Sequence, residues 1–388
     1  MKCRYDIHTV VMSLTYIMLA VCSMVFAVAC SGDGTLSDVP VGEHEARMSL
    51  YISLESTPAA TTRATPKGSY DDGRKTPYEN YIGADNYRVL LFDTGNKYIT
   101  TLIPESLNPV EGDGTTSKLY VLTGRLTAPL PSSFKVMMLA NWPAYPSTAS
   151  LVPGVSTVDD VCTAPEGFYQ YKDAFMPSAQ IPIPMFGIKR FDGKTFTPGF
   201  STYLGTIHLL RAMAKIEVRC DQKWWNIESA TLSHHATGGF CAPADVYDEG
   251  DYVKNDYNLD YTDDIHIAEP QVAGGPVGLR PQADGSFVIY VPEYRNTTRG
   301  TAKAGDAAEI TVTFREIDGK TYKIDFRDYN TDTAGVPPSE DKEFDIRRNY
   351  YYRFAITKAD ENAEPKISLD VTPYHVVKLD PIFGRDDK

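Results

Sequence analysis

The sequence predicts a mainly β protein, and two observations point to that fold class. The 388 residues include 25 Tyr, 28 Gly and 26 Pro, a composition that favours half-buried strands joined by tight turns over long helices. Many short segments alternate apolar and polar residues with a period of two, which is the pattern of a strand buried on one face. Several such strands are typical of β-sandwiches and barrels. The length and the hydrophobic share of 42% allow two domains with cores of their own.

Residues 1–29 predict an export signal. Lys2 and Arg4 form a short basic region, and a long apolar run follows that ends in small residues directly before Cys30, in the sequence AVAC. The run is long enough to span a membrane, but no cluster of Lys or Arg follows it as it would after a transmembrane anchor. Because AVAC resembles the lipobox of bacterial lipoproteins, we predict that the signal peptide is removed and that Cys30 is lipidated.

Residues 30–46 predict a lipidated, flexible tether between the membrane and the fold. They are polar and acidic, and they show no apolar period. The thiol of Cys30 would take up diacylglycerol, and several acyl chains at about 0.8 kcal/mol per buried methylene would hold the chain at the membrane.

The first predicted strand is followed by a long polar segment. Met48, Leu50, Ile52 and Leu54 alternate with polar residues, which predicts a strand that buries one face. Residues 57–80 are rich in Thr, Pro, Gly and charged residues, and we expect them to form an exposed loop.

The remaining predicted strands fall into two series. The first lies in segments 87–93, 117–126, 133–142 and 181–191, and the second in segments 205–220, 286–294, 309–317, 321–329, 349–357 and 366–379. The change near residue 205 predicts an N-terminal domain at 47–205 and a C-terminal domain at 206–388. Residues 206–215 could instead form one or two helical turns, because their apolar residues do not alternate cleanly.

Charge and cysteine spacing disfavour two classes of function. The net charge of −13 and the lack of a basic block argue against a nucleic acid partner. The sequence has no CxxC pair, so neither a zinc ribbon nor a thioredoxin-type site is indicated. If Cys30 is lipidated, Cys162, Cys220 and Cys241 remain in the mature chain. We expect buried free thiols, with a disulfide between Cys220 and Cys241 left open.

No motif points to a catalytic or metal site, since GxSxG, HExxH, GxGxxG and the P-loop are missing from the sequence. His234 and His235 lie between Cys220 and Cys241, but no close pair of ligands anchors a zinc site there. Residues 245–264 carry eight carboxylates among four Tyr without the spacing of a calcium loop, so we expect a solvated acidic loop. We predict no metal, no cofactor and no catalysis, with a hydrolase that uses paired carboxylates as an open alternative.

At residues 209–218, LLRAMAKIEV, the chain resembles the fimbrillins, the type V pilin superfamily of Bacteroides-like bacteria. IPIPMFG upstream, FVIYVPEYRN and RNYYYRFAIT downstream and VTPYHVVKLDPIFG at the end carry the same resemblance, which covers nearly everything after residue 45. The resemblance implies two transthyretin-like β-sandwich domains in tandem. It also implies export as a lipoprotein of the cell outer membrane and assembly into a surface fimbria.

The resemblance further implies cleavage after an Arg in the loop behind the first strand. TTRATP matches such a site, so we predict processing between Arg63 and Ala64, with Arg47 as the second candidate. The cut would separate the first strand from the rest and leave an apolar groove flanked by unpaired backbone groups. A strand from another subunit could fill that groove by β-augmentation.

The C-terminal segment 366–379 is the candidate donor strand. Its apolar residues of one parity are Ile367, Leu369, Val371, Val377 and Leu379. The alternative is that this segment is the last strand of its own sandwich, and Pro373 and Pro381 interrupt the ladder that a long donor strand needs.

These observations predict a structural subunit of a surface fimbria, assembled with other fimbrial subunits by strand exchange after proteolytic removal of the first strand. One alternative is an anchor or accessory subunit that keeps its lipid. Another is a surface lipoprotein that binds glycans, with residues 245–264 or Trp224 and Trp225 as stacking platforms. A host or bacterial surface receptor is a further partner that the sequence leaves open.

Overall fold

A computed structural model gives the fold of the protein. It describes residues 46–54, 77–110, 114–147, 149–171, 174–220, 225–243, 273–298, 302–303, 305–315, 321–327, 345–357 and 366–373. These residues belong to one compact unit, Glu43–Lys388. Strands make up most of their regular structure, so the predicted mainly β fold class is confirmed.

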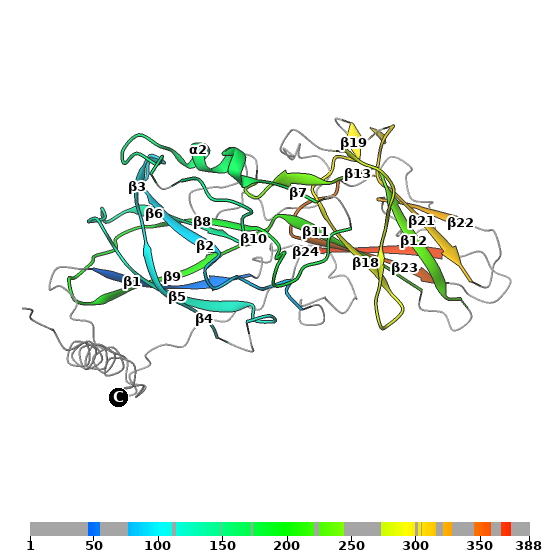
Figure 1. Ribbon diagram of the computed structural model, residues 1–388, viewed down its shortest axis with the longest axis horizontal. Coiled ribbons are helices and arrows are strands. Elements are labelled where there is room, and N and C mark those ends of the chain that lie inside the picture. The colour runs from blue at the N-terminus through cyan, green and yellow to red at the C-terminus, as the bar shows by residue number, and fades with distance from the viewer. Residues whose placement is uncertain are drawn as a thin grey trace, which may run out of the picture. The chain divides into compact units, whose positions relative to one another are not determined.

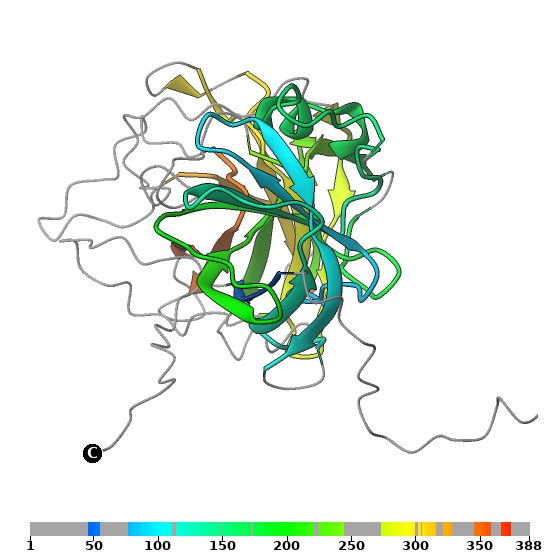
Figure 2. The same cartoon turned by 90° about the vertical axis from the view of Figure 1, so that its left-hand side faces the viewer.

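Two sheets take their strands from the described residues up to Arg211 (Figure 1). The first has the order β4-β5-β1-β9, with β4 at Ile103–Pro109, β5 at Leu119–Arg125, β1 at Arg47–Ser53 and β9 at Ser201–His208. The second has the order β10-β8-β6-β2-β3, with β10 at Leu210–Arg211, β8 at Met185–Phe191, β6 at Phe134–Ala140, β2 at Tyr87–Phe92 and β3 at Tyr98–Thr101. Figure 2 turns these two sheets toward the viewer.

Two further sheets take their strands from Met213 onward. One has the order β17-β18-β11-β23-β24, with β17 at Arg280–Pro281, β18 at Phe287–Pro292, β11 at Met213–Cys220, β23 at Tyr350–Thr357 and β24 at Lys366–Pro373. The other has the order β16-β12-β21-β22, with β16 at Val277–Gly278, β12 at Ile227–Ser233, β21 at Glu309–Phe314 and β22 at Thr321–Asp325.

The remaining described elements are short. The two-stranded pairs are β13 (His235–Ala236) with β15 (Ala273–Gly274), β14 (Gly238–Phe240) with β7 (Phe168–Gln170), and β19 (Thr297–Thr298) with β20 (Ala302–Lys303). The helices are α2 at Val158–Cys162 and the 3-10 turn η1 at Pro165–Gly167. Thr157 caps α2 through a capping box with Asp160, and hydrogen bonds from Thr157 lower the pKa of the Asp160 carboxyl. No helix in the described part of the chain is both long and apolar enough to cross a membrane.

The sequence patterns match the positions of the strands within their sheets. β6, in the continuous apolar run of segment 133–142, is buried along its whole length and lies between β2 and β8. β5 alternates buried and partly exposed residues, because only one of its faces meets the core. A connected cluster of buried apolar side chains extends from Met48 to Ile356.

Residues 206–215 form parts of strands β9, β10 and β11, so the helical alternative is wrong for this segment. The chain leaves one sheet and enters the next here, and every residue from Leu209 to Lys215 is buried. Burial on both faces removes the clean alternation that a strand with one wet face would show. The predicted domain boundary between residues 205 and 206 falls inside β9, and the division into domains at 47–205 and 206–388 remains a proposal.

Candidate functional site

The predicted first strand is β1, and it lies inside its sheet rather than at an edge. It pairs antiparallel with β5 and parallel with β9 (blue in Figure 1). Its inward side chains Met48, Leu50 and Ile52 are buried, as is Leu54 directly after the strand. The predicted strand and its buried face are therefore confirmed. Since β1 separates β5 from β9, its removal would leave two ladders without partners.

Gly205 shapes the parallel ladder between β1 and β9. The register shifts between the pair Ser49–Tyr203 and the pair Tyr51–Thr206, so β9 has one residue more than β1 at this point. Gly205 adopts a φ of 121°, a backbone conformation that residues with a Cβ rarely take. The extra residue allows Leu204 and Ile207 of β9, which are three residues apart, both to be buried.

Arg47, the second candidate for processing, is the first residue of β1. Its guanidinium lies 3.2 Å from Glu105, and Arg125 on β5 lies 3.3 Å from the same carboxylate. Its backbone pairs with Arg125 and Ser201 on the two neighbouring strands. A protease would have to open both ladders to reach this bond. Arg63 and Ala64 lie outside the described residues.

A groove opens beside the start of β1. Its volume is about 740 Å³, and Ala46, Leu126, Leu130 and Phe196 line it together with the exposed side chain of Ile103. The chain enters β1 at this groove, where the amide of Leu126 donates to the carbonyl of Ala46.

Arg211 forms hydrogen bonds at the C-terminal end of β1. Nη1 of this buried side chain donates to the carbonyl of Leu54 at 3.1 Å, and Nε donates to the carbonyl of Glu79 at 3.1 Å. Nη2 donates to the side chain of Asn80, and Nη1 also donates to Asn349 at 3.0 Å. A single side chain thus holds both ends of the segment in which processing is predicted, at Leu54 before it and at Glu79 and Asn80 after it.

Glu79 is held by a buried ion pair. Its Oε1 lies 2.9 Å from Nζ of Lys215 on β11, and both side chains are almost inaccessible, at 0% and 2%. The hydroxyl of Tyr290 on β18 donates to the same oxygen. The prediction of an exposed loop over residues 57–80 is therefore wrong at its end, where Glu79 and Asn80 are fully buried. The composition of residues 57–80 could not indicate the burial of Glu79, because its partner Lys215 lies on a distant strand.

One signal in the sequence could have indicated these residues. Arg211 and Lys215 are charged residues within the apolar run of segment 205–220. Charged side chains are rarely fully buried unless they are paired, so their place in such a run indicates buried partners.

The candidate donor strand corresponds in part to β24. Strand β24 lies at the edge of its sheet and pairs antiparallel with β23, placing Ile367, Leu369 and Val371 opposite Ile356, Phe354 and Tyr352. In this structure it is the last described strand of its own sheet, as the alternative predicts. Val377 and Leu379 lie outside the described residues, and so does Cys30.

Of the candidate stacking platforms for a glycan, the structure describes only Trp225. Trp225 is buried and packs its ring 4.8 Å from Phe314 and 5.9 Å from Tyr322, so its role as an exposed platform is wrong. Trp224 and residues 245–264 lie outside the described residues.

The cysteines and histidines form no metal centre within the described ranges, where no group of three or more His, Cys, Asp or Glu is placed to hold an ion. Cys162, Cys220 and Cys241 form no disulfide, which answers the open question of a bond between Cys220 and Cys241. Cys162 and Cys241 are buried as expected, whereas Cys220 is partly exposed. Burial raises the pKa of the Cys241 thiol, so this thiol stays protonated and unreactive. His234 is exposed with a positive φ of 56°, whereas its neighbour His235 is buried.

Burial also gives His235 a predictable effect on stability. It lowers the pKa of the imidazole from its usual value of 6.5, because the charged ring is costly inside the fold. Below about pH 6.5 the unfolded chain then binds a proton that the folded protein does not. The free energy of unfolding must fall with decreasing pH, by at most about 1.4 kcal/mol per unit from this group. Tyr171 and Tyr290 are the titratable side chains that share its cavity, and no described Asp, Glu, Lys or Arg lines it.

We expect His235→Gln to lose less stability than the wild type when urea unfolding is compared at about pH 7.5 and pH 5.5. The matched control is His234→Gln, which changes the exposed neighbour and should follow the wild type. An equal loss in the wild type and in His235→Gln would contradict the prediction.

Comparison with known proteins finds similar solved structures at low sequence identity. No protein-family model matches the chain, and no curated protein matches it. The tip fimbrial protein Mfa3 from Porphyromonas gingivalis, solved with a C-terminal truncation, is similar at 15% identity over 84% of this chain and 99% of that chain, with a TM-score of 0.48. A fimbrial assembly protein from Parabacteroides distasonis is similar at 15% identity over 85% of this chain and 99% of that chain, with a TM-score of 0.41. A putative polysaccharide-binding protein from Bacteroides thetaiotaomicron is also similar, at 15% identity over 85% of this chain and 98% of that chain, with a TM-score of 0.39.

Proposed function

We propose that the protein is a structural subunit of a surface fimbria. It is exported as a lipoprotein through Cys30 to the cell outer membrane, and it assembles with other fimbrial subunits by strand exchange after cleavage between Arg63 and Ala64. Its two domains are transthyretin-like β-sandwiches in tandem. No catalysis and no cofactor are required for this function.

The observation that carries the proposal is the place of β1 in its sheet. β1 lies between β5 and β9 and buries Met48, Leu50, Ile52 and Leu54. A cut behind it would separate this part of the core from the rest of the chain. Its loss exposes apolar surface and leaves backbone groups of β5 and β9 unpaired, which is costly in water. A strand from another subunit with the same alternation of apolar and polar residues would cover the apolar surface and pair the backbone groups of β5 and β9.

The C-terminal segment of a second copy is the proposed donor. Ile367, Leu369 and Val371 lie on β24, an edge strand that can leave its sheet without dividing it. Val377 and Leu379 continue the same parity and would extend the donated strand. The groove of about 740 Å³ beside Ala46 offers apolar room for such an extension.

Cleavage and assembly can be tested together on the purified protein. Treatment with a trypsin-like protease is expected to give a product that begins at Ala64, and this product should form ladders that resist mild heating in detergent. The Arg63→Gln variant should not give the product that begins at Ala64, while Arg74→Gln, which removes another Arg of the same segment, should give it as the wild type does. A chain that begins at Ala64, stays monomeric and ignores an added peptide of residues 366–379 would contradict the proposal.

The anchor alternative is favoured by the contacts of Arg211. Its hydrogen bond to Leu54 and the two ladders of β1 would hold the strand in place even after the chain is cut. The same experiment separates the two roles. An anchor subunit keeps the fragment that ends at Arg63 bound through gel filtration after the cut, whereas a subunit that exchanges strands releases it when the donor peptide is present.

A further inference from the structure

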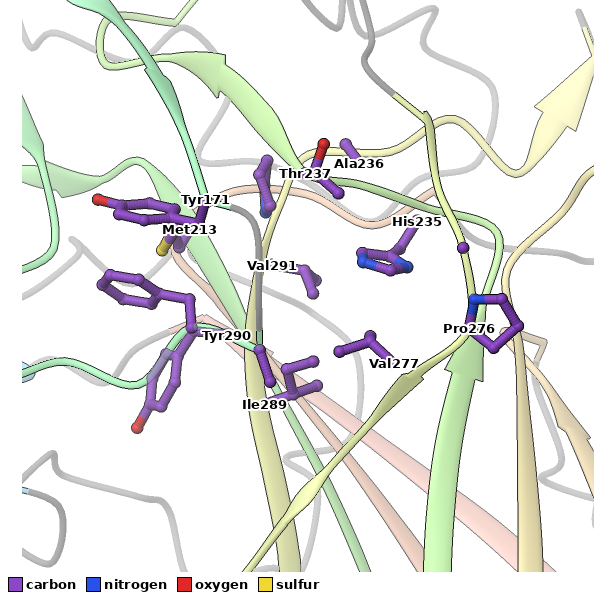
Figure 3. Close-up of a pocket in the computed structure, with 14 residues that line it drawn as sticks. Tyr171, Met213, His235, Ala236, Thr237, Pro276, Val277, Ile289, Tyr290 and Val291 are labelled. Atoms are coloured by element: carbon purple, nitrogen blue, oxygen red, sulfur yellow. The ribbon is translucent and has the colours of Figure 1, made fainter.

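A cavity of about 220 Å³ lies beside β13, near the residues that join the first two sheets to the last two. Tyr171 and Phe175 line it from one side, Tyr290 and Val291 from β18, and Val277 from β16. We call it the His235 cavity, because His235 on β13 projects into it (Figure 3). It is separate from β1, so a ligand bound there would be independent of the fimbrial proposal.

His235 is the feature that distinguishes this cavity from a packing defect. The side chain is only 6% exposed, and its Nδ1 has no hydrogen-bond partner among the described residues. Figure 3 shows its ring directed to the space between Val277 and Val291. Buried polar atoms are nearly always hydrogen-bonded in folded proteins, and an unpaired one is costly. A ligand that hydrogen-bonds this ring would remove the cost.

The walls of the cavity restrict the chemistry of that ligand. No charged side chain lines it within the described part of the chain, so a charged ligand would lose its hydration without gaining a partner. Most of the side chains that line the cavity are apolar or aromatic, so few of the several hydroxyl groups of a sugar would meet a polar side chain. The walls therefore favour a neutral ligand with few polar groups.

The shape and the volume of the cavity restrict the class of ligand further. The rings of Tyr171 and Phe175 lie 4.3 Å apart, and those of Phe175 and Tyr290 lie 6.4 Å apart, so one side of the cavity is an aromatic cluster. Aromatic clusters favour further rings at their edges and faces. An apolar cavity of about 150 Å³ is large enough to bind benzene, so the His235 cavity has room for one ring with small substituents.

We propose that the His235 cavity binds a small phenol, whose ring packs against Tyr171 and Phe175 and whose hydroxyl group hydrogen-bonds the imidazole of His235. A phenolic hydroxyl can donate or accept, so it can pair with either tautomer of the neutral ring. The phenol can be a free compound or the side chain of a tyrosine, since both present the same group.

The probe is 4-methylphenol, compared with toluene, which has the same shape without the hydroxyl group. Calorimetry and ligand-observed NMR on the full chain should give a Kd for 4-methylphenol of about 1 mM or tighter, and binding about tenfold tighter than that of toluene. Binding of toluene as tight as that of 4-methylphenol, or no binding of either at about 10 mM, would overturn the proposal.

Two variants test whether the compounds bind in the His235 cavity and whether the imidazole causes the preference for 4-methylphenol. His235→Phe keeps the size of the ring but removes its nitrogens, so the tenfold preference for 4-methylphenol should disappear, while His234→Phe should retain it. Val277→Phe fills the cavity from a partly exposed position and should abolish binding of both compounds in a protein that still unfolds cooperatively. A preference that survives in His235→Phe would overturn the proposal even if the filled variant does not fold.

N-acetyltyrosinamide separates the two sources of the phenol. If it binds at least as tightly as 4-methylphenol, the cavity accepts a tyrosine on a polypeptide. If 4-methylphenol binds and N-acetyltyrosinamide does not, the backbone is excluded and the ligand is a free compound. Both results support the proposed chemistry, whereas failure of 4-methylphenol to bind refutes it.

Discussion

Lys215→Met is expected to lower the free energy of unfolding by about 3–5 kcal/mol. The ammonium group of Lys215 lies 2.9 Å from Glu79, and neither side chain is in contact with water. Its loss removes the ammonium group from beside a carboxylate that stays buried with the hydroxyl of Tyr290. Urea unfolding followed by tryptophan fluorescence measures the difference.

The matched control is Lys323→Met on β22. Lys323 forms an ion pair of similar length with Glu309, 2.7 Å, but its side chain is 68% exposed. Water replaces the lost partner there, so the expected loss is below about 1 kcal/mol. Equal losses in the two variants would mean that burial does not govern the energy of the Glu79 pair.

Leu50→Ala is expected to lower the free energy of unfolding by about 2–5 kcal/mol. Leu50 is the central inward residue of β1 and lies opposite Leu122 of β5, and both side chains are buried. Truncation leaves a cavity between strands that are fixed by pairing on both sides of β1, so the surroundings cannot collapse to fill it.

Ser49→Ala is the control on the same strand. Ser49 points to the opposite face of the sheet and is partly exposed, so the expected change is within about 0.5 kcal/mol. A small effect of Leu50→Ala would show that β1 contributes little to the core. The proposal that its removal drives assembly would then fail as well.

Local sequence patterns predicted where the strands lie, but they did not predict which distant residues each segment contacts. The alternation in segment 48–54 was enough to predict the buried face of β1, because side chains alternate between the faces of any strand. The burial of Glu79 could not be predicted, since it depends on Lys215 and Tyr290, which lie far along the chain. Residues 206–215 were ambiguous because the passage between two sheets buries both faces of the chain.

The sequence by itself determined the mainly β class, the strand pattern and the inward residues of β1, since these depend on composition and on a period of two. Only the tertiary structure decided that β1 lies between β5 and β9, that Arg211 holds Leu54 together with Glu79 and Asn80, and that the ring of His235 lies in a cavity. Strand pairing and ion pairing join residues that are distant in the chain, and the pattern within a segment contains no information about which distant segment will meet it.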